Sequence, residues 1–243
     1  MTSDSRLVRE IEHSQVILKR GERIWNWSSP AGRIRLEKRC RLFRSLLKGN
    51  QNNVLEIGCG TGLFTECIAH TDNQIYAIDI SKDLLDKARK RVPSNVIFKV
   101  DNAHCSDFEN ACFDYILGSS ILHHLEVGPA LKEIFRLLKP GGEFLFTEPN
   151  MLNPQIALQK NIPFIRKLAG DSPDETAFIR WSIRKRIKRL GFINVQVKPF
   201  DFLHPAIPSL LISVIKPIST WLEFLPLIRE IAGSLIITAK KPG

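Results

Sequence analysis

The segment that most constrains this chain runs from Val54 to Gly62 and has the sequence VLEIGCGTG. A short apolar run ends in an acid and a glycine-rich turn, and residues 63–69 then predict a helix. A strand, a glycine turn and a helix in this order favour a nucleotide-like ligand over the helix N-terminus. Glycines permit the close approach of such a ligand because they carry no Cβ.

Two kinds of ligand compete for this turn. The dinucleotide fingerprint Gly-x-Gly-x-x-Gly needs its third glycine at position 63, where this chain has Leu63. The glycines present are Gly58, Gly60 and Gly62, and Glu56 comes two residues before the first of them. A carboxylate at that place opposes a pyrophosphate and suits a ligand that carries an ammonium group. The turn favours the second kind of ligand, and an NAD-dependent oxidoreductase stays as an alternative.

Two further acids follow predicted strands. Residues 74–79 predict a strand that ends in Asp79, about 20 positions after the turn, where a carboxylate can accept two hydrogen bonds from a ribose diol. Residues 96–100 predict the next strand, which Asp101 follows. Each acid alone is as often a simple strand-end residue, since Asp is common in turns. Their order after Glu56 favours a shared ligand site.

Over residues 50–150 these motifs resemble the class I S-adenosylmethionine-dependent methyltransferases. The resemblance is strengthened by a predicted strand at 113–118 and by the helix end, proline-glycine turn and strand at 138–146. It implies an α/β fold, a Rossmann-like three-layer sandwich whose seven-stranded sheet is mostly parallel with an antiparallel last strand. It also implies S-adenosylmethionine as cofactor, with a binding site formed by Glu56, Gly58, Cys59, Gly60, Gly62, Asp79, Ile80, Asp101, Asn102, Ala103 and Ser119.

Within that implied site each group has a role. Glu56, Gly58 and Gly60 would frame the methionine portion of the cofactor, Asp79 the ribose, and Asp101 with Asn102 the adenine.

The pair His123-His124 is the strongest candidate for acid–base chemistry, because it follows a strand at the ligand-binding end of the predicted sheet. Imidazole can accept the proton that a hydroxyl acceptor loses as it is methylated. The surrounding segment 118–125 resembles the small-molecule branch of the family, including the ubiquinone and menaquinone biosynthesis methyltransferases. Local packing is the competing role for each histidine. The lesser candidates are Glu148, Asn150 and His204.

The formal net charge of +10 is concentrated in two predicted basic helices. A solvated face is the plainer interpretation of each, and phosphate binding is the functional one. An RNA methyltransferase is therefore an alternative. No nucleic-acid module and no Asn-Pro-Pro-aromatic motif is present, so nucleic acid is not the expected partner. The basic positions are Arg33, Arg35, Lys38, Arg39, Arg41 and Arg44 in the first helix, and Arg180, Arg184, Lys185, Arg186, Lys188 and Arg189 in the second.

Five cysteines without regular spacing argue against a disulfide framework and favour a reducing cytoplasm. The polar N-terminus predicts no signal peptide, and we predict no metal site because no Cys/His set has zinc-finger spacing. The expected location is cytoplasmic, with peripheral membrane contact as a further expectation.

Residues 192–197 and 234–239 predict the last two strands, and an apolar insert at 204–233 separates them. Four prolines interrupt this insert, so it does not predict a membrane span but two short helices around Pro217. A buried helical cap is the plainer interpretation. A wall for a hydrophobic acceptor, or an element that rests on a membrane, is the functional one.

Residues 1–48 predict a helical arm ahead of a methyltransferase domain at 49–243. Trp25 and Trp27 lie in a polar loop of this arm, which suggests a lid over the ligands, with simple packing as the alternative. The sequence thus predicts methyl transfer from S-adenosylmethionine to oxygen or carbon of a small-molecule or lipid-like acceptor. A non-catalytic cofactor-binding protein is the remaining alternative.

Overall fold

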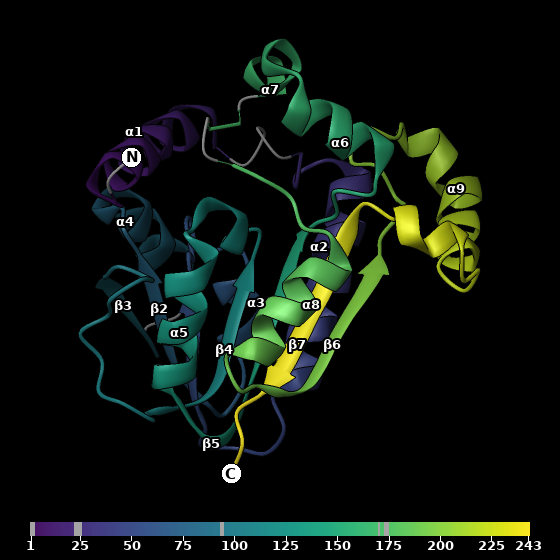
Figure 1. The fold of residues 1–243 in the computed structure, drawn as a ribbon. Coiled ribbons are helices and arrows are strands. Elements are labelled where there is room, and N and C mark those ends of the chain that lie inside the picture. The colour runs from purple at the N-terminus through teal and green to yellow at the C-terminus, as the bar shows by residue number, and fades with distance from the viewer. Residues whose placement is uncertain (1–2, 22–25, 93–94, 170, 173–174) are drawn as a thin grey trace.

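The computed structural model describes residues 3–21, 26–92, 95–169, 171–172 and 175–243. In this part of the chain seven strands form one sheet in the order β3-β2-β1-β4-β5-β7-β6 (Figure 1). Only β7 is antiparallel to its neighbours, β5 and β6, which confirms the predicted topology. The strands are β1 (Asn53–Ile57), β2 (Gln74–Asp79), β3 (Val96–Val100), β4 (Phe113–Ser119), β5 (Leu138–Pro149), β6 (Ile193–Phe200) and β7 (Ser234–Lys240).

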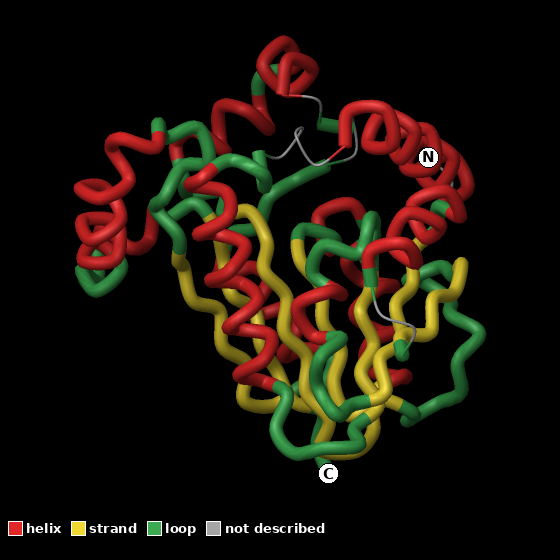
Figure 2. The backbone as a smooth tube through the Cα atoms, turned by 180° about the vertical axis from the view of Figure 1, so that it is seen from behind, coloured by secondary structure: helices red, strands yellow, loops and turns green. Residues whose placement is uncertain are grey.

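Helices cover both faces of the sheet and its upper edge, as the two opposite views show (Figures 1 and 2). The α-helices are α1 (Ser3–Arg20), α2 (Pro30–Leu46), α3 (Thr65–Ile68), α4 (Lys82–Arg91), α5 (Val127–Leu137), α6 (Pro154–Asn161), α7 (Pro163–Ala169), α8 (Arg180–Arg189) and α9 (Ser209–Leu222). Two short 3₁₀ helices are η2 (Leu122–His124) and η3 (Ile228–Ile231).

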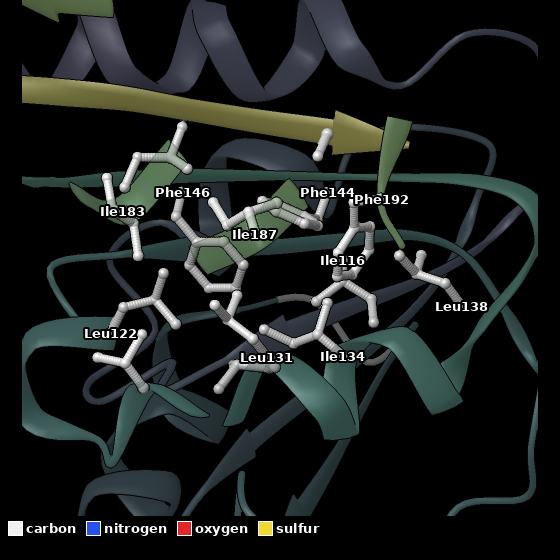
Figure 3. Packing of buried hydrophobic residues seen from close by; sticks show 14 of the residues in the cluster. Ile116, Leu122, Leu131, Ile134, Leu138, Phe144, Phe146, Ile183, Ile187 and Phe192 are labelled. Carbon is white, nitrogen blue, oxygen red and sulfur yellow. The ribbon is translucent and has the colours of Figure 1, made fainter. Parts of the chain in front are cut away.

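Two apolar layers result from this arrangement. On one face, α5 and α8 bury Leu131, Ile134 and Ile187 against Phe144 and Phe146 of β5 (Figure 3). On the other face, side chains of α2, α3 and α4 pack on β1 and β2. These layers position the carboxyl ends of the parallel strands, where doubly wound folds bind their ligands.

The strands predicted at 74–79 and 96–100 have the predicted bounds. Ser81 is the N-cap of α4, and its Oγ accepts a hydrogen bond from Leu84 N. The helix after the glycine turn is shorter than predicted. It spans only Thr65–Ile68, because the turn itself extends to Leu63 and Phe64.

The apolar insert differs from the prediction of two short helices. A single helix, α9, continues through Pro217. Pro217 cannot donate to the carbonyl of Ser213, but both residues are exposed, so water can satisfy that carbonyl.

One basic side chain differs from its expected place. Arg39 of the first basic helix is buried rather than solvated. Trp27 is buried edge-on against Phe64, as the packing alternative for the arm expects, while Trp25 lies outside the described residues.

The expectation that no disulfide forms is wrong for one pair. Cys40 of α2 is bonded to Cys67 of α3, while Cys59, Cys105 and Cys112 are free. The bonded cysteines are separated by 27 positions and meet only because α2 packs on α3. Their spacing in the sequence could not indicate that contact.

A buried ion pair joins the arm to the C-terminal part of the fold. Arg39 Nη1 donates to Asp201 Oδ2 at 2.7 Å, and Arg35 Nε donates to the same oxygen at 2.8 Å. Arg39 Nη2 also donates to Ser234 Oγ at 2.8 Å, at the start of β7. The Asp201 backbone N–H in turn donates to Glu223 Oε1, just after α9. Four segments therefore converge on one pair of charges.

This pair predicts a pH-dependent stability. The two guanidinium groups outweigh burial and lower the pKa of Asp201 to about 2, whereas an unfolded Asp titrates near 3.9. Its contribution is therefore complete above pH of about 5 and is lost as the pH falls toward 2. We expect Asp201→Asn to lower the free energy of unfolding by about 3 kcal/mol or more at pH 7, because it leaves buried cations uncompensated.

The measurement is guanidinium unfolding of both proteins between pH 7 and pH 3. The difference between them should be constant down to pH of about 5 and then shrink. Asp86→Asn, which removes an exposed i,i+3 pair with Arg89, is the control and should cost less than about 0.5 kcal/mol. A cost for Asp201→Asn as small as that of the control would contradict the interpretation.

Candidate active site

A cavity of about 480 Å³ lies at the carboxyl ends of β1, β2 and β4. Residues of α1, α2 and α6 complete its walls, together with Asp171 and Glu175 ahead of α8 and with His204 and Pro205 after β6. Figure 1 shows α1 and α6 beyond this edge of the sheet. The position is the one at which the sequence analysis expects a cofactor.

The glycine turn forms one wall from backbone alone. Gly58 N and Cys59 N both donate to Ile78 O, at 2.9 and 3.1 Å, so β2 fixes the turn. Gly60 has a φ of +53°, and a Cβ built on it would meet no atom within 4 Å. The open space at Gly60 is the cradle that a close-lying ligand needs.

Asp79 stands beside this turn with both carboxylate oxygens fixed. Oδ2 accepts from Gly60 N at 2.8 Å and Oδ1 from Ser81 N at 2.9 Å. Burial raises the pKa of this carboxyl although both backbone donors lower it. Each oxygen retains a lone pair, so Asp79 can accept the two hydroxyl hydrogens of a ribose.

Four more of the predicted cofactor residues line the cavity: Ile80, Asp101, Ala103 and Ser119. Asp101 is held by Asn102 N, Ser106 Oγ and Lys99 Nζ, all at 2.7 to 2.9 Å. The residues expected to meet ribose and adenine are therefore neighbours along one wall.

Three predicted residues lie behind that wall instead. Asn102 accepts from His104 N through its Oδ1, and Gly62 faces α4, where a Cβ would lie 3.0 Å from the Cβ of Ala88. Glu56 is buried in β1, and its Oε2 has no hydrogen-bond partner among the described residues. Burial and the nearby Asp79 raise the pKa of Glu56 to about 7. That unpartnered oxygen is suited to an ammonium donor, and its role in cofactor binding stays a prediction.

Six side chains gather at the other end of the cavity, and we name them the His–Glu cluster. His123 Nδ1 lies 2.7 Å from Glu148 Oε2, and Glu148 Oε1 accepts from Ile121 N and Leu122 N. His124 Nδ1 lies 3.0 Å from a Glu10 oxygen. The cluster consists of Glu10, His13, His123, His124, Glu148 and Glu175.

Burial and charge separate the two central histidines. Burial lowers the pKa of His123 well below its ordinary value. Burial also lowers the pKa of His124, but the negative charges of Glu10 and Glu175 have the larger combined effect, so the net shift of its pKa is upward. Glu175 is buried too, yet His124, His123 and Lys160 lower its pKa to about 2. Burial raises the pKa of Glu148 to about 7.

Sequence reasoning did not find half of this cluster. Glu10 and His13 come from α1 and Glu175 from a loop, and no motif marks them. Glu148, a lesser candidate, proves to be part of the cluster, and His204 lines the cavity. The third lesser candidate, Asn150, has a structural role: its side-chain amide donates to the backbone carbonyls of Glu230 and Ala232, ahead of β7.

The comparisons agree with this geometry. Residues 55–146 match the family described as "Methyltransferase domain". A demethylmenaquinone methyltransferase of Anoxybacillus flavithermus is 27% identical over 172 residues, which cover 61% of this chain and 73% of the relative. Nodulation protein S of Rhizobium tropici is 31% identical over 120 residues, which cover 47% of this chain and 50% of the relative.

Solved structures share the fold. A methyltransferase of Thermotoga maritima superposes with a TM-score of 0.70 at 19% identity, covering 95% of this chain and 99% of its own. A phosphoethanolamine N-methyltransferase of Haemonchus contortus, solved with S-adenosylmethionine, has a TM-score of 0.64 at 19% identity. The superposition covers 95% of this chain and 60% of that protein.

The matched domain, the relatives and the shared fold support a class I S-adenosylmethionine-dependent methyltransferase. The glycine cradle and the carboxylate of Asp79 fit that cofactor. The comparisons give no support to the oxidoreductase, RNA methyltransferase or non-catalytic alternatives. Within the described part of the chain, every helix is too short or too polar to cross a lipid bilayer, in agreement with the interpretation of the insert.

The cavity wall predicts the effect of removing Asp79. We expect Asp79→Ala to weaken S-adenosylmethionine binding at least about tenfold, because it removes hydrogen bonds to a charged acceptor and loosens Gly60. Isothermal titration calorimetry measures this change. Asp83→Ala in the first turn of α4, which does not line the cavity, is the matched control. Equal affinities of the two variants would contradict the assignment of this wall.

Proposed function

We propose that this methyltransferase modifies oxygen or carbon of a small, hydrophobic, lipid-like acceptor. One observation carries the proposal: an exposed apolar surface adjoins the cavity. The insert that begins at His204 supplies both His204 and Pro205 to the cavity wall and the exposed side chains of α9. An apolar acceptor could thus pass from this surface into the site.

This surface consists of exposed apolar side chains of the insert. Leu210 and Leu227 are each 88% exposed. Isolated exposed apolar residues are ordinary, but Leu210, Val214 and Ile218 recur at helical spacing on one face of α9, and such a set favours a membrane or a hydrophobic ligand. The residues of this surface on the insert are Leu210, Leu211, Val214, Ile218, Trp221, Phe224, Leu227, Ile228 and Ile231.

The relatives support a small-molecule acceptor. Several of them are named demethylmenaquinone methyltransferases, so a quinone-like acceptor with an apolar tail is consistent with this chain. Lys216 and Arg229 flank the apolar residues of the insert. Basic groups beside an apolar surface favour contact with anionic lipid, so we propose that the protein docks peripherally on such membranes.

The His–Glu cluster would activate the acceptor. When bound, S-adenosylmethionine supplies a methyl group on a sulfonium sulfur that is already a good leaving group. An acceptor hydroxyl would have to lose its proton as it takes up that methyl group. His123 and His124 line the cavity and would assist that loss, with Glu148 fixing the ring of His123.

The proposal predicts where a transferred label appears. The purified protein is incubated with methyl-labelled S-adenosylmethionine and an extract of the source cells, and the products are partitioned between organic and aqueous phases. We expect protein-dependent label in the organic phase. Label confined to the aqueous phase would overturn the lipid-like acceptor.

Two sets of variants complete that experiment. Asp79→Ala should abolish label in both phases. His123→Ala and His124→Ala should reduce labelled product at least about tenfold while leaving cofactor affinity unchanged. Unchanged turnover in both histidine variants would remove the cluster from the mechanism.

The apolar surface predicts binding to vesicles. In co-sedimentation with phosphatidylglycerol vesicles, the double variant Leu210→Glu, Leu227→Glu should bind at least about tenfold more weakly, because it replaces apolar contacts with charges that repel the lipid. Ile193→Glu is the control, since Ile193 is 44% exposed but lies on β6, outside this surface. Equal loss in both proteins would contradict docking through the insert.

A further inference from the structure

The cofactor wall and the apolar surface leave the composition of the His–Glu cluster unexplained. Two histidines and one carboxylate would suffice to orient an acceptor. The cluster instead brings together three imidazoles and three carboxylates from four separate segments of the chain. Mixed imidazole and carboxylate donors are the ligands that divalent transition metals prefer.

The central donors lie close enough to share one ion. His123 Nε2 is 3.8 Å from Glu175 Oε2, and His124 Nδ1 is 3.8 Å from Glu175 Oε1. One ligand atom from each of these three residues lies within 4.8 Å of the others. Metal–ligand bonds of about 2.0–2.2 Å place neighbouring donors roughly 3.3 Å apart, so the two pairs at 3.8 Å need to approach by about 0.5 Å and the widest pair by no more than about 1.5 Å.

Two further donors border this set. A Glu10 oxygen lies 3.0 Å from His124 Nδ1, and His13 Nε2 lies 4.0 Å from Glu175 Oε1. Both belong to α1. These two residues and His123, His124 and Glu175 all line the cavity. An ion held by them would therefore face the cavity, where an open coordination position, as in catalytic metal sites, could receive an acceptor.

Glu148 gives His123 the orientation that a metal ligand needs. With Nδ1 directed at Glu148 Oε2, the Nε2 atom faces Glu175. A carboxylate behind a metal-bound imidazole fixes its tautomer and raises its basicity. Glu148 is itself held by two backbone N–H groups, so this orientation is built into the end of β5.

Charged groups of both signs surround the cluster. Glu10, Glu148, Glu175 and Asp171 face it, Lys160 is paired with Asp171 and Glu175, and Arg6 donates to the carbonyl oxygens of His123 and His124. Lys160 Nζ donates to Glu175 Oε2 at 2.7 Å, and Ser172 N donates to Glu175 Oε1 at 2.6 Å. Each carboxylate oxygen of Glu175 therefore keeps one lone pair that can bind an ion.

We propose that His123, His124 and Glu175 bind a divalent transition metal ion, with Glu10 and His13 as additional ligands. This inference rests on the proposed function, because it places the metal where the acceptor enters. An acceptor hydroxyl bound at the open position would lose its proton to solvent more readily, since the ion stabilises the oxyanion. With the ion bound, the two histidines act as ligands and not as proton acceptors, and the methylated atom is oxygen.

Metal binding can be tested without cofactor or acceptor. Untagged, chelator-treated full-length protein is titrated with Zn²⁺ by calorimetry and with Co²⁺ by visible absorption. We expect one equivalent to bind, with the intense visible bands of four- or five-coordinate Co²⁺. His123→Ala and Glu175→Gln should each weaken binding at least about tenfold and alter these bands.

Two controls separate this site from adventitious binding and from misfolding. His204→Gln removes another histidine of the cavity wall and should leave the affinity unchanged. Lys160→Met removes the cation that competes for Glu175 and should tighten binding, a gain that an unfolded variant cannot produce.

Absence of binding, or equal affinity of His123→Ala, Glu175→Gln and the parent protein, would overturn the metal site. Either result would leave the labelled-product experiment unaffected, because that experiment tests the acceptor class and needs no metal assignment.

Discussion

The buried contact between Arg39 and Asp201 is the interaction on which the arrangement of this molecule depends. A single carboxylate oxygen takes two guanidinium donors, from Arg39 and Arg35, and the same region holds the start of β7 and the end of α9. The charge pair thereby fixes α2, and α2 carries a wall of the cavity. Because the charges are buried, loss of either partner costs far more than loss of a surface pair.

The cofactor side of the cavity could be predicted because it is local in the sequence. Glycine positions, strand ends and the acids that follow them lie within one stretch, and each reflects a backbone requirement that spacing reveals. Asp79 and Gly60 meet at 2.8 Å as their order in a strand-turn-strand unit suggests. The sheet topology followed from the family resemblance and not from periodicity, which shows only that strands and helices alternate.

The acceptor side could not be predicted in the same way. Glu10 and Glu175 meet His124 through tertiary packing of α1 and a loop, and nothing in their neighbouring residues marks that contact. The bond between Cys40 and Cys67 has the same origin. The continuous helix through Pro217 shows that a local signal can also mislead. Proline usually ends a helix, but it is tolerated here because solvent can replace the missing donor.

This division of the cavity follows a division of the chain. The residues expected to hold the cofactor lie almost wholly within the part that matches the methyltransferase family, whereas Glu10, His13 and Glu175 lie outside it. Under the proposed function, substitutions in α1 or in the loop that carries Glu175 would alter contacts with the acceptor and leave the cofactor wall intact. The two ends of the cavity can thus be varied separately.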